Sequence, residues 1–479
     1  MVTVRYAILL HLLVACSDGD DSGTGTPPGG NSFAVTAVAP ANGATDVEIN
    51  ASVTASFSEA VASSTLNAES FALKQGAEPV PAAVAYDDGS RLARLTAPLL
   101  PGITYQATVT TAVQTGDGTP LDAPKEWSFG TRAWPSITLD NGAPSGLSLI
   151  LDASGTLHLA YAVWPDLKYA TCSASCSLVA SWRSVTIDQG EWPSLAIDGA
   201  GRLHMTYEAS GKAVYATCTA SCLDSSNWDI VAIDEGSTLG EGPSVKADDD
   251  GRVHVSYADI VSGDIKYATC ASECASQSQW ETAVVADLDV VHYLTSIAVE
   301  SSGRVHITFE DIGELASHTH LAYATCASDC TTAANWEWIT VDPGNLTGAV
   351  NSLVVDGNGR AHVAYSSGGD FQIHYATCGA DCTTAANWQI VGIPTILGGS
   401  APSLAVDRTG RVHISYNQYI NFSDSELRYA TCAAGCTDFA NWQTVLLYPG
   451  VVIRTSILVD GTGRVRLSHD GGVTVNYEE

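Results

Sequence analysis

The chain has 479 residues, which is enough for two or more domains, and its 45% hydrophobic content is that of a globular protein. It carries 52 acidic and 21 basic residues, which gives a formal net charge of −31. This charge argues against nucleic acid or an anionic lipid surface as a partner.

The N-terminal residues have the pattern of a bacterial export signal. Arg5 is a short basic region, and residues 6–15 are apolar but too few to span a bilayer. The stretch ends in Leu13-Val14-Ala15-Cys16, which resembles the lipobox of bacterial lipoproteins. This resemblance implies a signal peptide over residues 1–15 and a diacylated Cys16. The alternative is an ordinary cleaved signal followed by an unrelated cysteine.

The lipoprotein resemblance also implies a location. Ser17, and not Asp, follows the cysteine, and by the sorting rule of that family this favours the outer membrane of the bacterial cell envelope. The membrane would then be a partner through the lipid anchor, with the folded part exposed at the cell surface. Residues 16–32 are rich in Asp, Gly, Ser, Thr and Pro, so we expect a flexible tether.

Residues 33–132 alternate apolar and polar positions between turn clusters, as in Val53-Thr54-Ala55-Ser56-Phe57, which predicts a β-sandwich. The landmarks Pro40-Ala41-Asn42-Gly43, Gly102-Ile103-Thr104-Tyr105 and Trp127-Ser128-Phe129-Gly130-Thr131 resemble the S-layer-type bacterial Ig-like domain. The resemblance implies a spacer or adhesive module. We expect the Tyr105 ring to be buried, with its hydroxyl tying down a nearby turn.

Residues 133–479 contain a repeat. Tyr-Ala-Thr-Cys, three residues, Cys, five residues and Trp occur six times, first at Tyr169 to Trp182, and the copies lie 46 to 56 residues apart. Each copy follows a strand–turn–strand pair, such as Pro193 to Tyr207, and precedes a further apolar strand. Four short strands in a unit of about 50 residues predict a β-propeller blade.

The ends of the array predict how the propeller closes. The strand–turn–strand pair occurs seven times, and the last unit stops after a third strand at residues 473–477. The array begins with an unpaired strand at residues 134–140, which matches the fourth strand at residues 182–188. We therefore expect an all-β protein, with an Ig-like β-sandwich and a seven-bladed β-propeller closed by an N-terminal strand.

Twelve of the thirteen cysteines form six Cys-x3-Cys pairs, which predicts a disulfide framework in an oxidising compartment. A zinc site is the alternative, but it needs four ligands, and only His320 and His374 lie near a pair. The predicted disulfides join Cys172 to Cys176, Cys218 to Cys222, Cys270 to Cys274, Cys326 to Cys330, Cys378 to Cys382, and Cys432 to Cys436.

A histidine recurs at one position in six blades, and Arg466 replaces it in the seventh. Equivalent positions in a ring lie too far apart to form one metal site, so we expect hydrogen bonds inside each blade. A repeated Asp and Gly-Arg form the first hairpin turn. Asp248-Asp249-Asp250 could bind Ca²⁺, although a solvated turn is favoured because no 12-residue ligand loop is present. The histidines are His158, His204, His254, His306, His362 and His413.

The first hairpin also distantly resembles the Asp-box of sialidase-like propellers, although the Asp-box Trp is absent. A sialidase needs several arginines that converge on a carboxylate. The six repeated arginines lie in the first hairpin turn, on the face opposite the usual ligand face, and only Arg454 lies in a loop of the right kind. A sialidase is therefore disfavoured.

Propeller ligands usually meet the loops from fourth to first strand and from second to third strand, and these loops vary most between the copies. Their aromatic, acidic and amide residues suit a carbohydrate or a peptide. The pair His318 and His320 could ligate a metal with Glu310, but this set is short of ligands. The candidate ligand-binding residues are Trp164, Glu191, Trp192, Glu241, His292, Tyr293, His318, His320 and Tyr419.

No convergent catalytic set is visible, so the sequence favours a binding protein over an enzyme. We expect a lipid-anchored, surface-displayed adhesion protein that binds an extracellular glycan or protein, without a cofactor or a metal. The alternative is an extracellular glycan hydrolase or lyase on a sialidase-like propeller. Its carboxylate pair would be Glu191 with Glu241 from adjacent loops.

Overall fold

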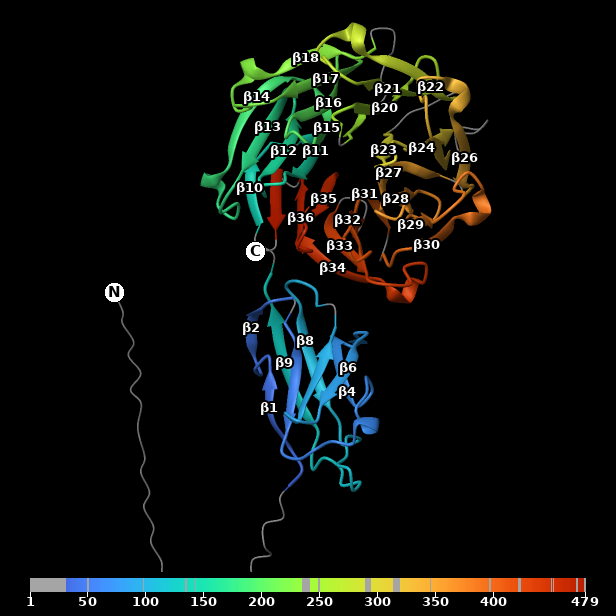
Figure 1. Ribbon diagram of the computed structural model, residues 1–479. Helices are drawn as coiled ribbons and strands as arrows, with labels where there is room; N and C mark the ends of the chain where they lie inside the picture. The colour runs from blue at the N-terminus through green and yellow to red at the C-terminus, as the bar shows by residue number, and fades with distance from the viewer. Residues whose placement is uncertain are drawn as a thin grey trace, which may run out of the picture. The chain divides into compact units, whose positions relative to one another are not determined.

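The computed structural model describes residues 32–49, 51–97, 99–133, 136–142, 144–234, 242–248, 250–288, 294–312, 319–344, 346–395, 398–420, 424–448, 450, 452–470 and 473–477 (Figure 1). The chain divides into two compact units, Met1–Arg132 and Ala133–Glu479. The described residues form strands, turns and short 3-10 segments without an α-helix. Within them, no helix has the length and apolar character needed to cross a membrane.

The first unit is a sandwich of two sheets, with strand orders β1-β3-β7-β6 and β2-β9-β8-β4-β5. One short 3-10 segment, η1 (Ser63–Thr65), precedes β4. The strands are β1 (Val35–Ala39), β2 (Ala44–Val47), β3 (Val53–Phe57), β4 (Phe71–Gln75), β5 (Glu78–Pro79), β6 (Ala83–Asp87), β7 (Leu92–Thr96), β8 (Thr104–Val109) and β9 (Lys125–Thr131).

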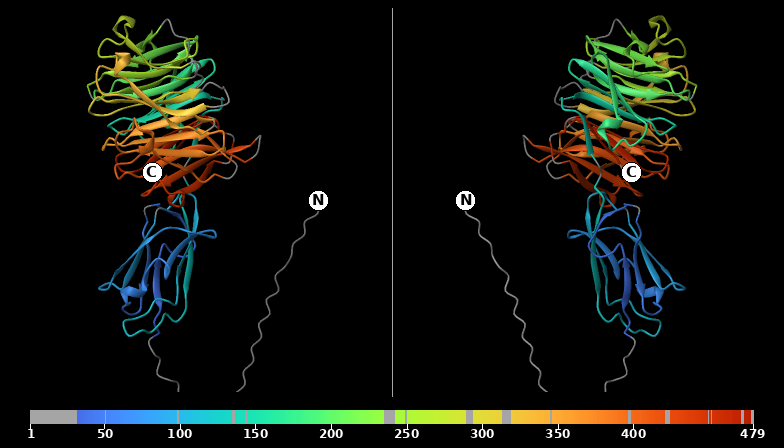
Figure 2. Two further views of the ribbon diagram at one scale, coloured as in Figure 1. Left: turned by 90° about the vertical axis from the view of Figure 1, so that its right-hand side faces the viewer. Right: turned by 90° about the vertical axis from the view of Figure 1, so that its left-hand side faces the viewer.

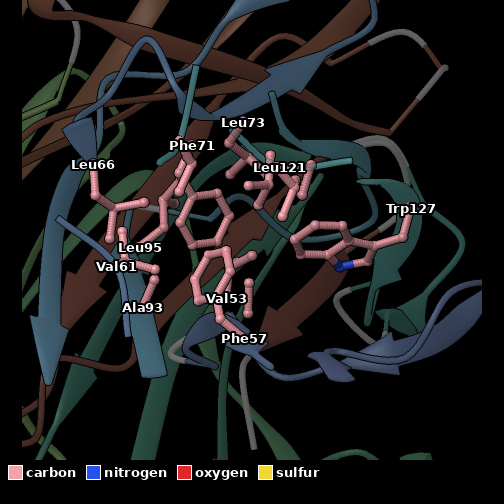
Figure 3. Packing of buried hydrophobic residues seen from close by; sticks show 14 of the residues in the cluster. Val53, Phe57, Val61, Leu66, Phe71, Leu73, Ala93, Leu95, Leu121 and Trp127 are labelled. Atoms are coloured by element: carbon pink, nitrogen blue, oxygen red, sulfur yellow. The ribbon is translucent and has the colours of Figure 1, made fainter. Parts of the chain in front are cut away.

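The sandwich core forms where the alternating apolar positions of the two sheets meet. Figure 3 shows Val53 and Phe57 of β3 packed with Phe71 of β4 and Trp127 of β9. The Phe71 and Trp127 ring centroids are 5.9 Å apart. The Tyr105 ring is 1% exposed, and its hydroxyl accepts a hydrogen bond from the backbone N–H of Leu100 at 2.6 Å. The expected role of this tyrosine is confirmed.

The second unit contains seven four-stranded antiparallel sheets, and blades 1 to 6 each take four consecutive strands. Blades 1 and 2 consist of β11 (Pro144–Leu151), β12 (Leu157–Val163), β13 (Asp166–Cys172) and β14 (Arg183–Gln189), and of β15 (Glu191–Ile197), β16 (Leu203–Ala209), β17 (Lys212–Cys218) and β18 (Asp229–Ala232). Blades 3 and 4 consist of β19 (Ser244–Ala247), β20 (Val253–Asp259), β21 (Asp264–Cys270) and β22 (Glu281–Asp287), and of β23 (Ser296–Val299), β24 (Val305–Ile312), β25 (Thr319–Cys326) and β26 (Glu337–Asp342). Blades 5 and 6 consist of β27 (Thr347–Val355), β28 (Ala361–Ser367), β29 (Ile373–Cys378) and β30 (Gln389–Gly392), and of β31 (Gly399–Val406), β32 (Val412–Tyr419), β33 (Ser425–Cys432) and β34 (Gln443–Tyr448).

Blade 7 closes the ring with strands from both ends of the unit. It consists of β35 (Thr455–Val459), β36 (Val465–His469), β37 (Val473–Tyr477) and, as its outer strand, β10 (Ser136–Asp140). Ile137 of β10 pairs with Val475 of β37 in an antiparallel register. Figure 1 shows β10 beside the C-terminal strands, and Figure 2 gives two side views of the same ring. The predicted seven-bladed propeller with an N-terminal closing strand is confirmed.

The repeated cysteines and tryptophans hold the outer part of each blade and join it to its neighbour. All six predicted Cys-x3-Cys pairs are disulfides. Each Trp indole N–H donates to the carbonyl of the second cysteine, as Trp228 does to Cys222 at 2.9 Å. In blades 2 to 6 the same indole packs on the tyrosine of the preceding blade, so that Trp228 lies 5.4 Å from Tyr169. The 3-10 segments before these tryptophans are η2 (Val179–Ser181), η3 (Ser225–Asn227), η4 (Gln277–Gln279), η5 (Ala333–Asn335), η6 (Ala385–Asn387) and η7 (Phe439–Asn441).

The six repeated histidines make hydrogen bonds inside their own blades, as expected. In blade 2, His204 Nδ1 lies 2.7 Å from the Tyr215 hydroxyl, and Nε2 lies 3.3 Å from Asp198. Burial lowers the pKa of His204 more than the Asp198 carboxylate raises it, so the imidazole is neutral at pH 7. Arg466 replaces the histidine in blade 7 and pairs with Asp460 at 2.7 Å.

The repeated acidic residue and glycine form the turn of the first hairpin in each blade. Asp198 Oδ1 accepts hydrogen bonds from the backbone N–H groups of Ala200 and Arg202, at 2.9 and 2.8 Å. Gly201 has a φ of +82°, which few other residues adopt without strain. This confirms the expected hairpin chemistry.

Candidate functional site

The antiparallel order of the strands sorts the loops of the propeller onto two faces. Loops from fourth to first strand and from second to third strand open on one face, which we call the variable-loop face. The first hairpins and the cysteine loops open on the other face. The sequence-variable loops and the closely repeated turns are thus separated by the topology alone.

A cavity of about 200 Å³ lies where the innermost strands of all seven blades begin. Because each innermost strand starts at the variable-loop face, the cavity belongs to that face; we call it the mouth. Its lining residues are Gly146, Leu147, Ser148, Trp192, Pro193, Ser194, Gly242, Pro243, Ser244, Leu294, Thr295, Ser296, Val350, Asn351, Ser352, Ala401, Pro402, Ser403, Arg454, Thr455 and Ser456.

One serine from each blade forms a closed ring around the mouth. Each Oγ accepts a hydrogen bond of 3.0–3.3 Å from the backbone N–H of the innermost strand of the next blade. Ser456 of blade 7 accepts from Leu149 of blade 1, which completes the circle. The seven members are Ser148, Ser194, Ser244, Ser296, Ser352, Ser403 and Ser456, and we call them the serine ring.

Trp192 is the largest side chain of the mouth, and its position is built into the neighbouring blades. A Cβ atom on Gly146 of blade 1 would lie 2.9 Å from the Trp192 Cα, and one on Gly242 of blade 3 would lie 2.9 Å from the Trp192 Cβ. Both distances are too short for real Cβ atoms, so glycine at these two positions leaves room for the backbone and the Cβ atom of Trp192. Trp192 also has a φ of +55°, which is uncommon for a residue with a side chain and costs about 1 kcal/mol or more.

Arg454 of blade 7 lies over the Trp192 ring, with the guanidinium carbon 4.2 Å from the ring centroid. This is the range of a cation–π contact. The loop of Arg454 is held by Asp470, whose Oδ1 accepts the N–H of Ile453 at 2.6 Å. The N–H of Asp470 donates in turn to the carbonyl of Arg454. The tryptophan and the arginine therefore meet across the mouth from blades 2 and 7.

Five of the nine predicted binding residues lie in the part of the chain that the structure describes. Trp192 lines the mouth, and Glu191 precedes it, paired in register with Glu208 on the next strand. Trp164 and Tyr419 lie at the ends of hairpins in blades 1 and 6, and are 74% and 40% exposed. The structure thus brings Trp192 to the cavity and leaves these two aromatics in the surrounding loops.

The remaining predictions have different outcomes. His320 directs Nδ1 to the carbonyl of Gly344 at 3.0 Å and so contacts a neighbouring loop. Among the described residues, no three His, Cys, Asp or Glu side chains group closely enough to hold a metal ion. Glu241, His292, Tyr293, His318 and Cys16 lie outside the described residues. The carboxylate pair Glu191 and Glu241 stays a prediction for that reason.

Exposed apolar side chains also occur in loops of the variable-loop face. Trp164, Val261 and Phe371 come from hairpins between second and third strands and are 74%, 78% and 63% exposed. Ile453, beside Arg454, is 62% exposed. Ile260, Tyr419 and Ile420 lie at hairpins between second and third strands, and Leu346 lies in a loop from fourth to first strand. These side chains leave apolar surface on the face that also carries the mouth.

Blades 4 and 5 bring together four titratable residues that the sequence analysis did not connect. His374 Nε2 lies 2.8 Å from Asp370, and Nδ1 lies 3.6 Å from Asp342. The Tyr365 hydroxyl donates to Asp342 at 2.6 Å and lies 3.3 Å from His374. Burial opposes the charged imidazole, but the hydrogen bonds with both carboxylates outweigh it and raise the pKa of His374.

Glu310, near the end of β24, is a deeply buried carboxyl group close to the variable-loop face. It is 4% exposed, and its Oε2 finds no hydrogen-bond partner among the described residues. Burial raises the pKa of Glu310 to about 7, although a hydrogen bond with Thr319 opposes the shift. The carboxyl group of Glu310 therefore keeps its proton to a higher pH than an exposed glutamate does.

The sequence analysis missed the serine ring and the pairing of Trp192 with Arg454. The serine had a visible signal, because the same position of the innermost strand is serine in all seven blades. For Arg454, the only sign in the sequence was its position in a variable loop. The two glycines that seat Trp192 carry no local signal, since their role depends on the blades on either side.

Comparison with known proteins supports the architecture. A family model described as a bacterial Ig-like domain matches residues 30–131, in agreement with the sandwich. No curated protein matches the chain.

Several solved structures are similar to the chain at low identity. A polysaccharide lyase of family PL25, an ulvan lyase bound to a GlcA(1-4)Rha3S ligand, is 14% identical at a TM-score of 0.48, over 72% of this chain and 95% of its own. A Hadza microbial sialidase is 10% identical at 0.40, over 81% and 76%. An auxiliary nutrient binding protein from Bacteroides thetaiotaomicron is 8% identical at 0.39, over 94% and 98%. At these values none assigns a ligand or an activity to the chain.

Proposed function

We propose that the protein is a lipid-anchored binding protein of the bacterial cell surface, and that its propeller binds an extracellular glycan at the mouth. The proposal depends mainly on how the fold holds Trp192. Two glycines from neighbouring blades leave room for the backbone and the Cβ atom of Trp192, and its backbone has a strained φ at the opening of the cavity. Strain of this kind is typical of functional sites.

The chemistry of the mouth suits a sugar better than an apolar peptide. Trp192 offers an indole, whose faces commonly stack on sugar rings, and the serine ring offers hydroxyl groups. The exposed aromatics Trp164, Phe371 and Tyr419 lie in loops of the same face, and further units of a polymer would contact them there. A protein ligand is the competing possibility, which the binding experiment below distinguishes.

The anchor proposal depends on the N-terminal pattern. Cys16 would carry the lipid, and residues 17–32 would separate it from the Ig-like sandwich. The six disulfides fit this proposal because such bonds persist in oxidising compartments outside the cytoplasm. The exported Cys16→Ser variant should stay in the aqueous phase when the sample is partitioned with detergent. Partition into detergent despite this change would contradict lipidation at Cys16.

A glycan array probed with the full-length Cys16→Ser chain tests the binding proposal. Trp192→Ala should weaken binding at least tenfold, equivalent to about 1.4 kcal/mol, because the stacking surface is lost. Trp338→Ala is the matched control, since Trp338 lies on the outer strand of blade 4 and is 38% exposed.

Two results would count against the proposal. Equal binding by wild type and Trp192→Ala would remove the mouth as the site. Release of shortened or unsaturated products from a bound glycan would favour the hydrolase or lyase alternative over a binding protein.

A further inference from the structure

A cluster of titratable side chains joins blades 4 and 5 at the variable-loop face. We infer that His374 forms a pH-sensitive link between these blades, which is strong under acidic conditions and weak under alkaline ones. The link consists of the contacts of His374 with Asp342, Tyr365 and Asp370, and it holds the hairpin between β28 and β29, which carries the exposed Phe371. The inference goes beyond the proposed function and does not depend on glycan binding.

The first argument is that the contacts of His374 cross the boundary between two blades. Asp342 ends β26, the outer strand of blade 4, whereas Tyr365 and His374 pair in register on β28 and β29 of blade 5. Nδ1 of His374 lies 3.6 Å from Asp342 and 3.3 Å from the Tyr365 hydroxyl. The other ring nitrogen, Nε2, lies 2.8 Å from Asp370 in the hairpin. One imidazole ring thus connects the outer strand of blade 4 with a hairpin of blade 5.

The second argument is that both ring nitrogens of His374 face acceptors. The Tyr365 hydroxyl donates its hydrogen to a carboxylate, so its oxygen can only accept from Nδ1, and Asp370 accepts from Nε2. A protonated imidazole donates from both nitrogens, whereas a neutral one has a single N–H. The repeated histidines differ, because His204 Nδ1 lies 2.7 Å from the Tyr215 hydroxyl, which can donate to the ring. The surroundings of His374 therefore suit the charged form.

The third argument is that blade 3 contains the same arrangement with a lysine. Lys266 pairs with Asp234, which follows the outer strand of blade 2, at 3.2 Å, and with Asp259 of its own blade at 2.9 Å. The Tyr257 hydroxyl donates to Asp234 at 3.0 Å. A lysine keeps its charge from acidic to moderately alkaline pH, whereas a histidine loses its charge within this range. With His374, blade 5 thus carries the titrating form of a contact that keeps its charge in blade 3.

The direction of the pH effect follows from the groups around the ring. Among the described residues, β30 presents Gly392, which has no side chain, in register with His374. On blade 4, His320 interacts with Asp311 and with the carbonyl of Gly344. Burial lowers the pKa of His374, but its two carboxylate partners outweigh burial and raise it above 6.5. The link is therefore fully present below pH 6.5 and is lost as the pH rises through the pKa of the folded protein.

Hydrogen exchange of the full-length Cys16→Ser chain tests the link. The chain is compared with and without His374→Lys at pH 6 and at pH 9, because the ratio of two chains at one pH cancels the intrinsic effect of pH on exchange. Residues 366–373 should exchange within about twofold of each other at pH 6, and about fivefold or more faster with the native histidine at pH 9. Residues 258–265 of blade 3 are the internal control and should not differ at either pH.

Lys266→His is the reciprocal variant, and it tests the inference separately if His374→Lys does not fold. It should transfer the pH dependence to blade 3, so that residues 258–265 exchange faster than in the unsubstituted blade at pH 9 and more nearly alike at pH 6. Thermal melting of each variant at pH 6 shows whether the propeller is folded.

Three results would overturn the inference. The first is equal exchange of residues 366–373 with histidine and with lysine at pH 9. The second is a difference of the same size at both pH values, which a purely structural role of the side chain would give. The third is a Lys266→His chain whose blade 3 shows no pH dependence. None of these results depends on a glycan, so the proposed function is tested separately.

Discussion

At the scale of single residues, repetition separates scaffold from site. The residues that recur in six or seven blades, such as His204, Asp198 and Ser352, have their hydrogen bonds inside a blade or between neighbours. Trp192 and Arg454 occur once, and they meet at the mouth. A position that repeats around the ring serves the ring, whereas a ligand needs features that break the symmetry.

Glu310 carries a buried carboxyl group, and its protonation should affect the stability of the fold. Its pKa is about 7 in the folded protein and 4.5 in an exposed chain, so the folded state binds more protons between these values. The contribution of Glu310 to stability is therefore present below about pH 4.5 and is lost as the pH rises through 7. The loss is on the order of 3 kcal/mol.

Urea unfolding of wild type and Glu310→Gln at pH 5 and pH 8 measures this effect. The stability of the variant relative to wild type should rise between the two pH values, since an amide does not ionise. Glu208→Gln is the control at the equivalent strand position of blade 2, where the side chain is half-buried. A relative stability of Glu310→Gln that does not change with pH would contradict the prediction.

At the scale of elements, two kinds of contact connect the blades. The serine ring joins the innermost strands near the axis, and the tyrosine–tryptophan contacts join blades farther out, beside the disulfides. Both contacts link one blade to the next, so a blade gains stability from its position in the ring. The residues that make these contacts therefore recur from one sequence repeat to the next.

Ser352→Ala should lower the free energy of unfolding by about 1 kcal/mol, because the N–H of Leu404 loses its acceptor. Ser301→Ala, in an exposed turn of blade 4, is the control and should change stability by less than about 0.5 kcal/mol. Urea unfolding followed by tryptophan fluorescence measures both. Equal stabilities for the two variants would argue against a structural role of the serine ring.

At the scale of the whole molecule, closure of the ring decides stability. Blade 7 depends on β10, which lies more than 300 residues from its partner β37 in the chain. Without this strand, β37 would present an open sheet edge, which favours pairing with other chains. The ring therefore couples the two ends of the propeller unit.

Ile137→Asp tests the closure, because Ile137 is 8% exposed in β10. A buried unpaired carboxylate in place of an apolar side chain should cost about 3 kcal/mol. Ser136→Asp, at an exposed position of the same strand, is the control. Hydrogen exchange should show faster exchange in blades 1 and 6 as well as in blade 7. Faster exchange confined to blade 7 would show that closure acts only locally.

Much of the fold was predictable from local patterns. The period of the Tyr-Ala-Thr-Cys repeat, the alternation of apolar residues and the match between residues 134–140 and 182–188 predicted the blades and their closure. The Cys-x3-Cys spacing predicted each disulfide, because both cysteines belong to one loop. These features depend on residues close in the chain or on a copied pattern, which a sequence displays directly.

The candidate site was predicted only in part, for a physical reason. Trp192 could be selected as an aromatic residue in a variable loop, but its contact with Arg454 arises because ring closure brings blades 2 and 7 to one opening. The need for Gly146 and Gly242 arises from the same packing, and the raised pKa of Glu310 from its burial. Local pattern thus determines the blade and the ring, whereas contacts and burial between distant segments exist only once the ring has closed.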